Sequence, residues 1–190
     1  LQNNFKIITR SINFIFKLLY VSPFLPYKNH ELVILSVIHL IKKGLKIELH
    51  LAGQGFDTIF NNCKEISDGY PEIIFHGNLN RDELNKLYNE ADLFIFASTC
   101  ENLPITLLEA MSFGLPIVCS NLKIFKEILG ERENVFFNLN GIEDISKKIE
   151  HSYTSNSFRK HQSKTNYKLS KKYTIYNSVN HTIDFLKKNC

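Results

Sequence analysis

Two glutamates, Glu101 and Glu109, are the residues whose types and spacing best suit chemistry in this chain. Glu101 closely follows an apolar run at residues 93–97. Glu109 lies in a segment that starts near Pro104 and ends at Gly114, the asymmetry expected of a helix. The neighbours of Glu109 are apolar, and a carboxylate among apolar side chains is costly to bury without a partner. We therefore look for a binding or catalytic site in this stretch.

The spacing of the two acids favours an elongated ligand over a proton-sharing pair. Glycosidase carboxyl groups lie about 5–9.5 Å apart, whereas eight residues of unbroken helix span ~12 Å. The helix start between Glu101 and Glu109 offers unpaired N–H groups and a positive dipole end, which suit a phosphate. A phosphate flanked by two acids that accept hydrogen bonds from hydroxyl groups describes a nucleotide-sugar. The alternative is that Glu101 is an ordinary loop acid and Glu109 pairs with a cation.

Three further loops carry residues that could contact such a ligand. Lys28 follows a first predicted strand on a proline-bounded loop, where it would neutralise a diphosphate; the alternative is a solvated loop lysine. Gly53 and Gly55 are a weak signal for a dinucleotide-binding loop, because Thr58 stands where the G-x-G-x-x-G fingerprint needs its third glycine. Small residues there, and in the pair Gly77–Asn78, could let the backbone approach a ligand.

The cysteines and histidines give no sign of a metal or nucleophilic centre. Cys63, Cys100, Cys119 and Cys190 lie far apart without a C-x-x-C pair, which indicates reduced thiols in a cytoplasmic protein. We expect no metal, since no Cys and His cluster with ligand spacing occurs. The histidines form no recognisable triad, and no serine lies in a G-x-S-x-G context.

The net charge of +4 hides a basic tail. Residues 151–190 hold eight Lys or Arg and one acid, whereas residues 1–150 hold fifteen and eighteen. A solvated helix face explains this; the competing hypothesis is peripheral contact with an anionic membrane on the cytoplasmic face. We expect no nucleic-acid partner, because aromatic residues do not interleave with the basic ones as in an RNP motif. No apolar run reaches the ~18–20 residues that span a bilayer.

Strand and helix patterns alternate about six times along the chain. Strands are expected at 15–21, 47–52, 72–76, 93–97, 115–119 and 134–138, and helices at 29–43, 57–67, 80–91, 104–113, 124–129 and 142–150. Asn80, with Glu83 three residues later, has the form of a capping box that would start the helix at 80–91. This alternation predicts a doubly wound α/β fold with a mainly parallel, Rossmann-like six-stranded sheet and helices on both faces. The loops at 22–29, 53–56, 77–80 and 98–104 would line one crevice at the carboxyl ends of the strands.

The same patterns suggest how the chain divides. We expect a linker or returning segment at 1–14, a nucleotide-sugar-binding domain at 15–152, and basic helices at 153–190 that pack on it, the last around 175–188.

Residues 101–111, ENLPITLLEAM, followed by Gly114-Leu-Pro-Ile-Val118, resemble the E-x7-E signature of group 1 glycosyltransferases (family 4, retaining, GT-B fold). The surrounding segments agree in order: 20–29 resembles the opening strand and donor-phosphate loop, 49–55 the second strand and its glycine loop, and 74–79 with 84–96 the approach to the motif. The resemblance covers residues 15–150. It implies the carboxyl-terminal, donor-binding half of a two-domain enzyme.

The resemblance also implies roles for individual residues. Glu101 would contact the transferred sugar as the catalytic residue, and Glu109 would bind the ribose hydroxyls. The backbone of the loop Asn102, Leu103, Pro104 and Ile105 would hold the diphosphate, with Lys28 as its cation. Gly53 and Gly55 would line the donor site, and the Gly77, Asn78 and Leu79 loop would lie near the base. The family needs no bound metal, and the missing N-terminal domain would bind the acceptor.

One departure from the family pattern concerns phosphate binding. Many members carry Gly-Arg before the first loop, with the arginine as a second phosphate cation, whereas Ser22-Pro23 stands there in this chain. The expected function is transfer of a hexose from a UDP- or GDP-sugar to a glycan or lipid-linked acceptor, as in polysaccharide biosynthesis, by a half that is inactive alone. The alternatives are a non-catalytic nucleotide-sugar-binding module and a nucleotide-sugar epimerase of GT-B shape.

Overall fold

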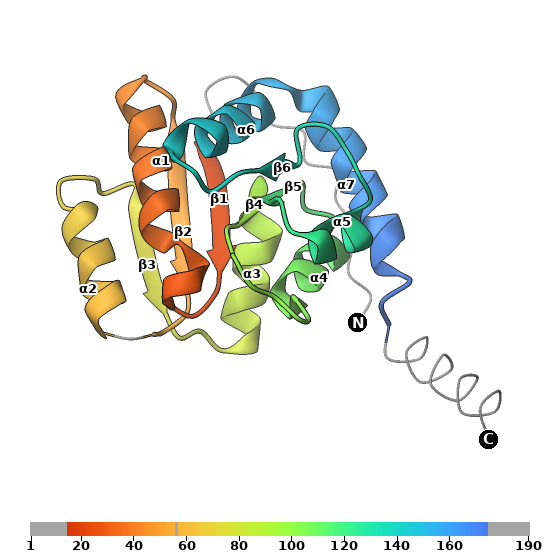
Figure 1. Ribbon diagram of the computed structural model, residues 1–190, viewed down its shortest axis with the longest axis horizontal. Helices are drawn as coiled ribbons and strands as arrows, with labels where there is room; N and C mark the ends of the chain where they lie inside the picture. Colours follow the sequence, from red (N-terminus) through yellow and green to blue (C-terminus); the bar gives the residue numbers. More distant parts are fainter. Residues whose placement is uncertain (1–14, 56, 175–190) are drawn as a thin grey trace.

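The computed structural model describes residues 15–55 and 57–174, and within them one six-stranded parallel sheet forms the centre (Figure 1). The order is β3-β2-β1-β4-β5-β6. The strands are β1 (Phe16–Val21), β2 (Ile47–Ala52), β3 (Ile73–Gly77), β4 (Leu93–Phe96), β5 (Ile117–Ser120) and β6 (Phe136–Phe137). The predicted fold class is confirmed. The predicted linker at 1–14 and the helix at 175–188 lie outside the described residues.

The helices follow the strands in the predicted alternation. They are η1 (Pro26–Lys28), α1 (His30–Lys42), α2 (Asp57–Ile66), α3 (Arg81–Glu90), α4 (Ile105–Ser112), α5 (Lys123–Leu129), α6 (Ile142–Thr154) and α7 (Asn156–Ser170). Asn80 caps α3 in a reciprocal capping box: its side chain accepts from the Glu83 amide at 3.0 Å, and the Glu83 carboxylate accepts from the Asn80 amide at 2.9 Å. The sequence pattern that predicted this cap is confirmed.

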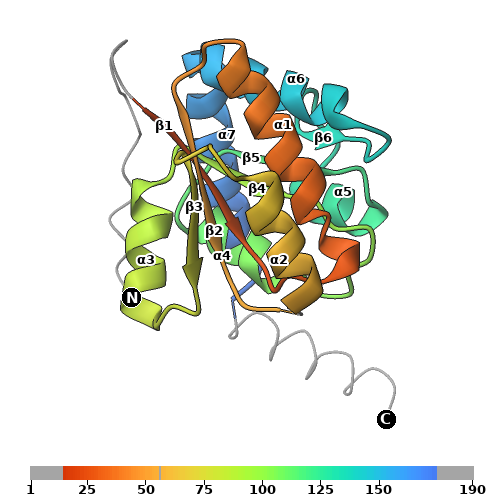
Figure 2. The same ribbon diagram turned by 90° about the vertical axis from the view of Figure 1, so that its left-hand side faces the viewer.

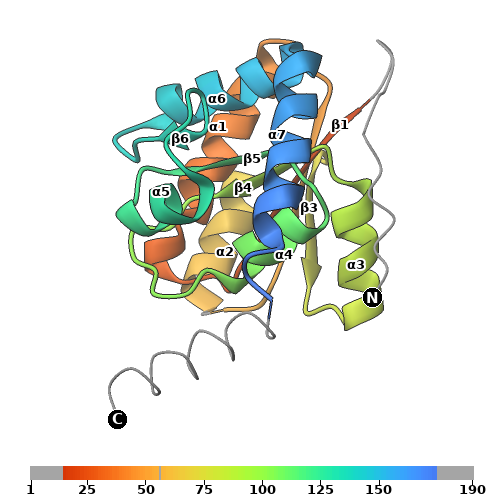
Figure 3. The ribbon, with the colours of Figure 1, turned by 90° about the vertical axis from the view of Figure 1, so that its right-hand side faces the viewer.

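Helices cover both faces of the sheet. Figure 2 shows α3 on one side of β1 and β2, with α1 and α2 on the other side. Helix α1 also packs against α6, and α4 packs against α7. Figure 3 shows α7 in front of β4 and β5. No helix among the described residues is both long and apolar enough to cross a membrane.

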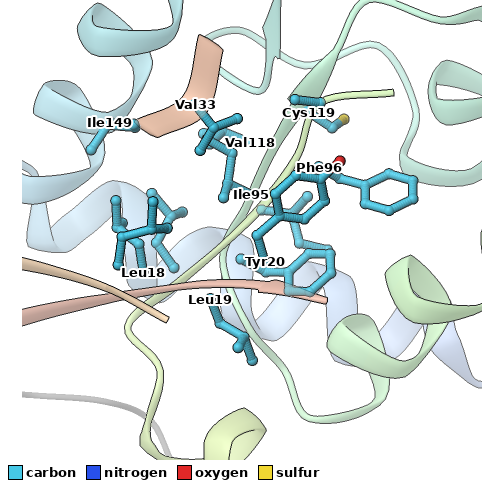
Figure 4. Close-up of a cluster of buried hydrophobic side chains, with 14 of the residues drawn as sticks. Leu18, Leu19, Tyr20, Val33, Ile95, Phe96, Val118, Cys119 and Ile149 are labelled. Carbon is cyan, nitrogen blue, oxygen red and sulfur yellow. The ribbon is translucent and has the colours of Figure 1, made fainter. Parts of the chain in front are cut away.

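Coverage on both faces explains why the central strands are continuous apolar runs instead of alternating ones. Every residue of β4 and β5 is buried, as are five of the six in β1. Figure 4 shows side chains from three strands and two helices meeting in this core: Leu18, Tyr20, Ile95, Phe96, Val118, Val33 and Ile149. The core therefore fixes β1, β4 and β5 as a rigid platform for the loops at their ends.

Several predicted strands differ from the observed ones by one residue at an end, and two differ by more. The strand expected at 115–119 starts at Ile117, because Gly114 has φ 69° and Pro116 has no amide hydrogen for the ladder. The strand expected at 134–138 is reduced to Phe136–Phe137, next to Asn134 in the left-handed region at φ 61°. Both shifts lie away from the loops expected to bind a ligand.

Candidate functional site

The strand order reverses between β1 and β4, and this switch point is where ligands bind in open α/β sheets. The loops that follow these two strands are joined there. The Thr99 amide donates to the Tyr27 carbonyl oxygen at 2.9 Å, and the Asn29 side chain donates to the Ala97 carbonyl oxygen at 2.7 Å. Asn29 has φ 50°, a left-handed conformation that asparagine tolerates better than most residues. These two hydrogen bonds hold the loop after β1 against the loop after β4.

Lys28 and Glu101 meet at this switch point. The Lys28 ammonium contacts the Glu101 carboxylate, and the two side chains are only 9% and 10% exposed. The ammonium also lies 4.9 Å from the centre of the Phe96 ring, and Tyr20 donates its hydroxyl hydrogen to the Lys28 carbonyl oxygen at 2.6 Å. The alternative of a solvated loop lysine is therefore wrong. The structure instead brings two predicted site residues, one per loop, into a buried ion pair.

The start of α4 exposes apolar side chains, and one of its backbone amides already makes a hydrogen bond. Leu103 and Ile105 are 64% and 59% exposed, whereas Pro104 is buried. The Ile105 amide donates to the Leu103 carbonyl oxygen at 2.9 Å, so this predicted phosphate donor is already hydrogen-bonded within the loop. Asn102 is exposed. A phosphate bound by the Ile105 amide would have to displace that bond.

Glu109 has partners of its own on α3. Its Oε1 lies 2.5 Å from Arg81 Nη1, and its Oε2 accepts a hydrogen bond from the Tyr88 hydroxyl at 3.0 Å. Burial, followed by the nearby Glu109 charge, raises the pKa of Tyr88, and the hydrogen bond to Glu109 raises the pKa of Arg81. Arg81 is thus the cation with which Glu109 pairs in the alternative interpretation, and sequence reasoning did not identify it. The signal was available, because Arg81 directly follows the predicted helix cap at Asn80.

The glycines at the ends of β2 and β3 have different surroundings. At Gly53 (φ 145°) a Cβ would lie 2.1 Å from the Ser22 carbonyl oxygen, and at Gly55 it would lie 2.3 Å from that of Phe24. The backbone at both glycines therefore lies close to the loop after β1. This contact explains why glycine is needed at both positions, without invoking a ligand. Gly77 has φ 66° with open space around it. Beyond it, Asn78 is exposed and Leu79 packs on the core.

His30 is buried near Lys28 and is a residue that sequence reasoning set aside. Its ring stacks on Tyr20 at 4.6 Å and on Phe24 at 4.1 Å between ring centres. Burial and the nearby Lys28 charge lower the pKa of His30 to about 3, so the ring is neutral. Across residues 15–55 and 57–174, no group of three or more His, Cys, Asp or Glu side chains could hold a metal. The expectation that no metal is needed stays a prediction.

Fold and site together define a doubly wound α/β protein with charged residues gathered at its switch point. The chain belongs to the group 1 glycosyl transferase family, whose model matches residues 13–169. The resemblance drawn from the E-x7-E signature is thereby confirmed.

Curated relatives are much longer than this chain. Protein CapJ of Staphylococcus aureus is 27% identical over 162 residues, which are 82% of this chain and 40% of CapJ. The serotype-specific mannosyltransferase WbdA of Escherichia coli is 31% identical over 105 residues, which are 55% of this chain and 13% of WbdA. The chain thus spans less than half the length of these two proteins.

Solved structures share the fold. The catalytic domain of cholesterol-α-glucosyltransferase from Helicobacter pylori aligns with a TM-score of 0.71 at 25% identity, over 85% of this chain and all of that one. The C-terminal domain of LpcC from Francisella tularensis aligns with 0.75 at 20% identity, over 84% of this chain and 87% of that one. HepE from Anabaena, solved with UDP and glucose, aligns with 0.79 at 15% identity, over 92% of this chain and 48% of that one.

Proposed function

We propose that this chain is the donor-binding half of a retaining glycosyltransferase that moves a hexose from a UDP- or GDP-sugar to a glycan or lipid-linked acceptor. The observation that carries the proposal is the buried Lys28–Glu101 pair at the switch point of a chain in this family. A cation and a carboxylate side by side suit the two parts of a donor that lie next to each other, the diphosphate and the sugar.

Each residue then has a separate task. Lys28 neutralises the diphosphate, Glu101 is the catalytic residue that contacts the transferred sugar, and Glu109 accepts hydrogen bonds from the ribose hydroxyls. The exposed start of α4 holds the phosphates through its backbone, and the loop at 77–79 lies near the base. No metal takes part. HepE was solved with UDP and glucose, which supports the class of donor.

Calorimetric titration of the 190-residue chain with UDP, GDP and their sugars tests the proposal. Glu109→Ala should weaken binding of the bare nucleotide, whereas Glu101→Ala should mainly weaken the additional contribution of the sugar. Absence of binding to all of these ligands at millimolar concentration would contradict the proposal. Equal loss of bare nucleotide affinity in both variants would contradict the division of roles.

A non-catalytic nucleotide-sugar-binding module is the second candidate, favoured by the Lys28–Glu101 contact, in which the proposed catalytic carboxylate is already paired. In the proposed enzyme an acceptor-binding N-terminal domain excludes water from the cleft, so this chain alone should bind donor and transfer sugar poorly. Joining it to such a domain should restore transfer if the chain is an enzyme half. Product analysis separates transfer from epimerisation, which would return an altered nucleotide-sugar.

Peripheral contact with an anionic membrane is the remaining part of the proposal. Lys160, Lys164 and Lys168 recur every fourth residue on α7 and share one side of that helix. Each lysine near an anionic surface contributes about 1 kcal/mol, so changing all three to Gln should abolish flotation with anionic liposomes. Changing the exposed lysines of three other helices, Lys86, Lys123 and Lys147, removes the same charge as a control. Flotation that does not depend on anionic lipid would exclude this contact.

A further inference from the structure

Arg81 and Tyr88 share one face of α3 and hold the Glu109 carboxylate from the same side. They are seven residues apart, two helical turns, and so point in the same direction. Arg81 contacts Oε1 at 2.5 Å, and Tyr88 contacts Oε2 at 3.0 Å. Each carboxylate oxygen therefore has one donor from α3.

An ionised carboxylate offers about four acceptor positions, two on each oxygen. The two donors on α3 occupy one position on each oxygen. One position on each oxygen is left, which is the number of acceptors that the two adjacent hydroxyl groups of a ribose require. The side chain of Glu109 is 21% exposed, so part of it is open to solvent.

Tyr88 is held more firmly than Arg81. Its side chain is buried, and its ring stacks on Phe113 with 5.0 Å between ring centres. Its hydroxyl also lies 3.3 Å from the Thr106 carbonyl oxygen, but the shorter contact with the charged Glu109 is the stronger one. Arg81 is 56% exposed, and an exposed ion pair contributes little by itself.

From this geometry we infer that Tyr88, assisted by Arg81, is a positioning residue that orients Glu109 for a ribose with both hydroxyl groups. The inference rests on the proposed function and adds to it two residues that touch Glu109 instead of the donor. It implies that removing either donor lowers the selectivity for ribose and leaves the rest of the site unchanged.

The test compares UDP and GDP with their 2′,3′-dideoxy analogues by calorimetry on the 190-residue chain. The wild-type chain should bind the ribonucleotide more tightly than its analogue. Tyr88→Phe keeps the ring and loses the hydroxyl, and it should reduce ribonucleotide affinity about tenfold while leaving that of the analogue unchanged. Arg81→Gln should reduce ribonucleotide affinity about threefold, and Arg81→Lys should restore part of the loss. A purely structural role would weaken both ligands equally.

Matched controls are Tyr153→Phe on α6 and Lys86→Gln, an exposed cation elsewhere on α3. Both should keep wild-type selectivity. If the wild-type chain binds no nucleotide, the proposed function and this inference fail together. If it binds nucleotide with ribose selectivity that Tyr88→Phe and Arg81→Gln both preserve, the inference alone fails. Tighter binding by Arg81→Gln would show that the arginine competes with the ribose and would also overturn it.

Discussion

Lys28 and Glu101 are 73 residues apart in the chain, yet their charged groups touch at the switch point of the sheet. Each comes from the loop after one of the two strands, β1 and β4, between which the strand order reverses. Both side chains are about nine-tenths buried. In the proposed function both residues contact the donor, so a donor must exchange this ion pair for contacts with its diphosphate and sugar.

Glu101→Gln should therefore bind bare UDP or GDP more tightly than the wild-type chain, by about tenfold, because Lys28 is released for the phosphates. The same change should lower the free energy of unfolding by about 2 to 3 kcal/mol, since it leaves a buried ammonium without its counter-charge. Calorimetry measures the first effect and urea unfolding the second.

The control for this pair is Glu150→Gln, which breaks the exposed Lys43–Glu150 contact at 2.8 Å. An exposed ion pair contributes at most about 1 kcal/mol, so this variant should unfold almost as the wild-type chain does and bind nucleotide equally. Weaker binding of bare nucleotide by Glu101→Gln would contradict the exchange of partners.

Gly53→Ala should destabilise the fold at the edge of the site. The new Cβ would lie 2.1 Å from the Ser22 carbonyl oxygen, and φ is 145° at this position. The loop after β1 would have to move, at a cost of about 3 kcal/mol or more in the free energy of unfolding. Gly69→Ala is the matched control, because φ is 79° there with open space around it, and it should cost about 1 kcal/mol. Similar losses in the two variants, measured by urea unfolding, would show that the contact with Ser22 does not matter.

The lowered pKa of His30 predicts that the folded chain loses stability in acid. Its pKa is about 3 in the folded chain and about 6.5 when unfolded. The unfolded state therefore binds the proton first as the pH falls below 6.5, so the stabilisation is complete above that pH and is lost on the way down to 3. The loss attributable to this one residue should reach about 2 kcal/mol between pH 7.5 and pH 5.

Urea unfolding at several pH values measures this effect. His30→Phe preserves the stack on Tyr20 and Phe24 and should show a shallower pH dependence than the wild-type chain. His161→Gln, at an exposed position on α7, serves as the control. Equal slopes for the wild-type chain and His30→Phe would exclude His30 as the source.

Gln162 on α7 should contribute strongly to stability through β5. Its amide donates to the Ile117 carbonyl oxygen at 3.2 Å and accepts from the Ile117 amide at 3.3 Å, both in the buried core. Gln162→Leu leaves buried backbone groups without a partner, which costs about 1 to 3 kcal/mol each. Lys164→Leu, on an exposed position of the same helix, should change the free energy of unfolding by less than about 0.5 kcal/mol. A loss for Gln162→Leu as small as that of Lys164→Leu would contradict this role.

The sequence by itself determined the order and type of the elements. Continuous apolar runs identified the buried strands, proline and glycine marked the ends of α4, and the Asn80–Glu83 spacing predicted the cap of α3. These signals are local, because they depend on residues within a few positions of each other. The E-x7-E signature is also local, and together with the ordered loops around it, it was enough to predict the family.

Only the tertiary structure decided which residues face one another. The order of the strands places Lys28 against Glu101, and the tertiary fold brings Arg81 and Tyr88 of α3 against Glu109 of α4. It also showed that Gly53 and Gly55 accommodate the backbone of the loop after β1. Periodicity cannot reveal such contacts, since they join residues 21 to 73 positions apart and arise only when the strands pair and the helices cover them.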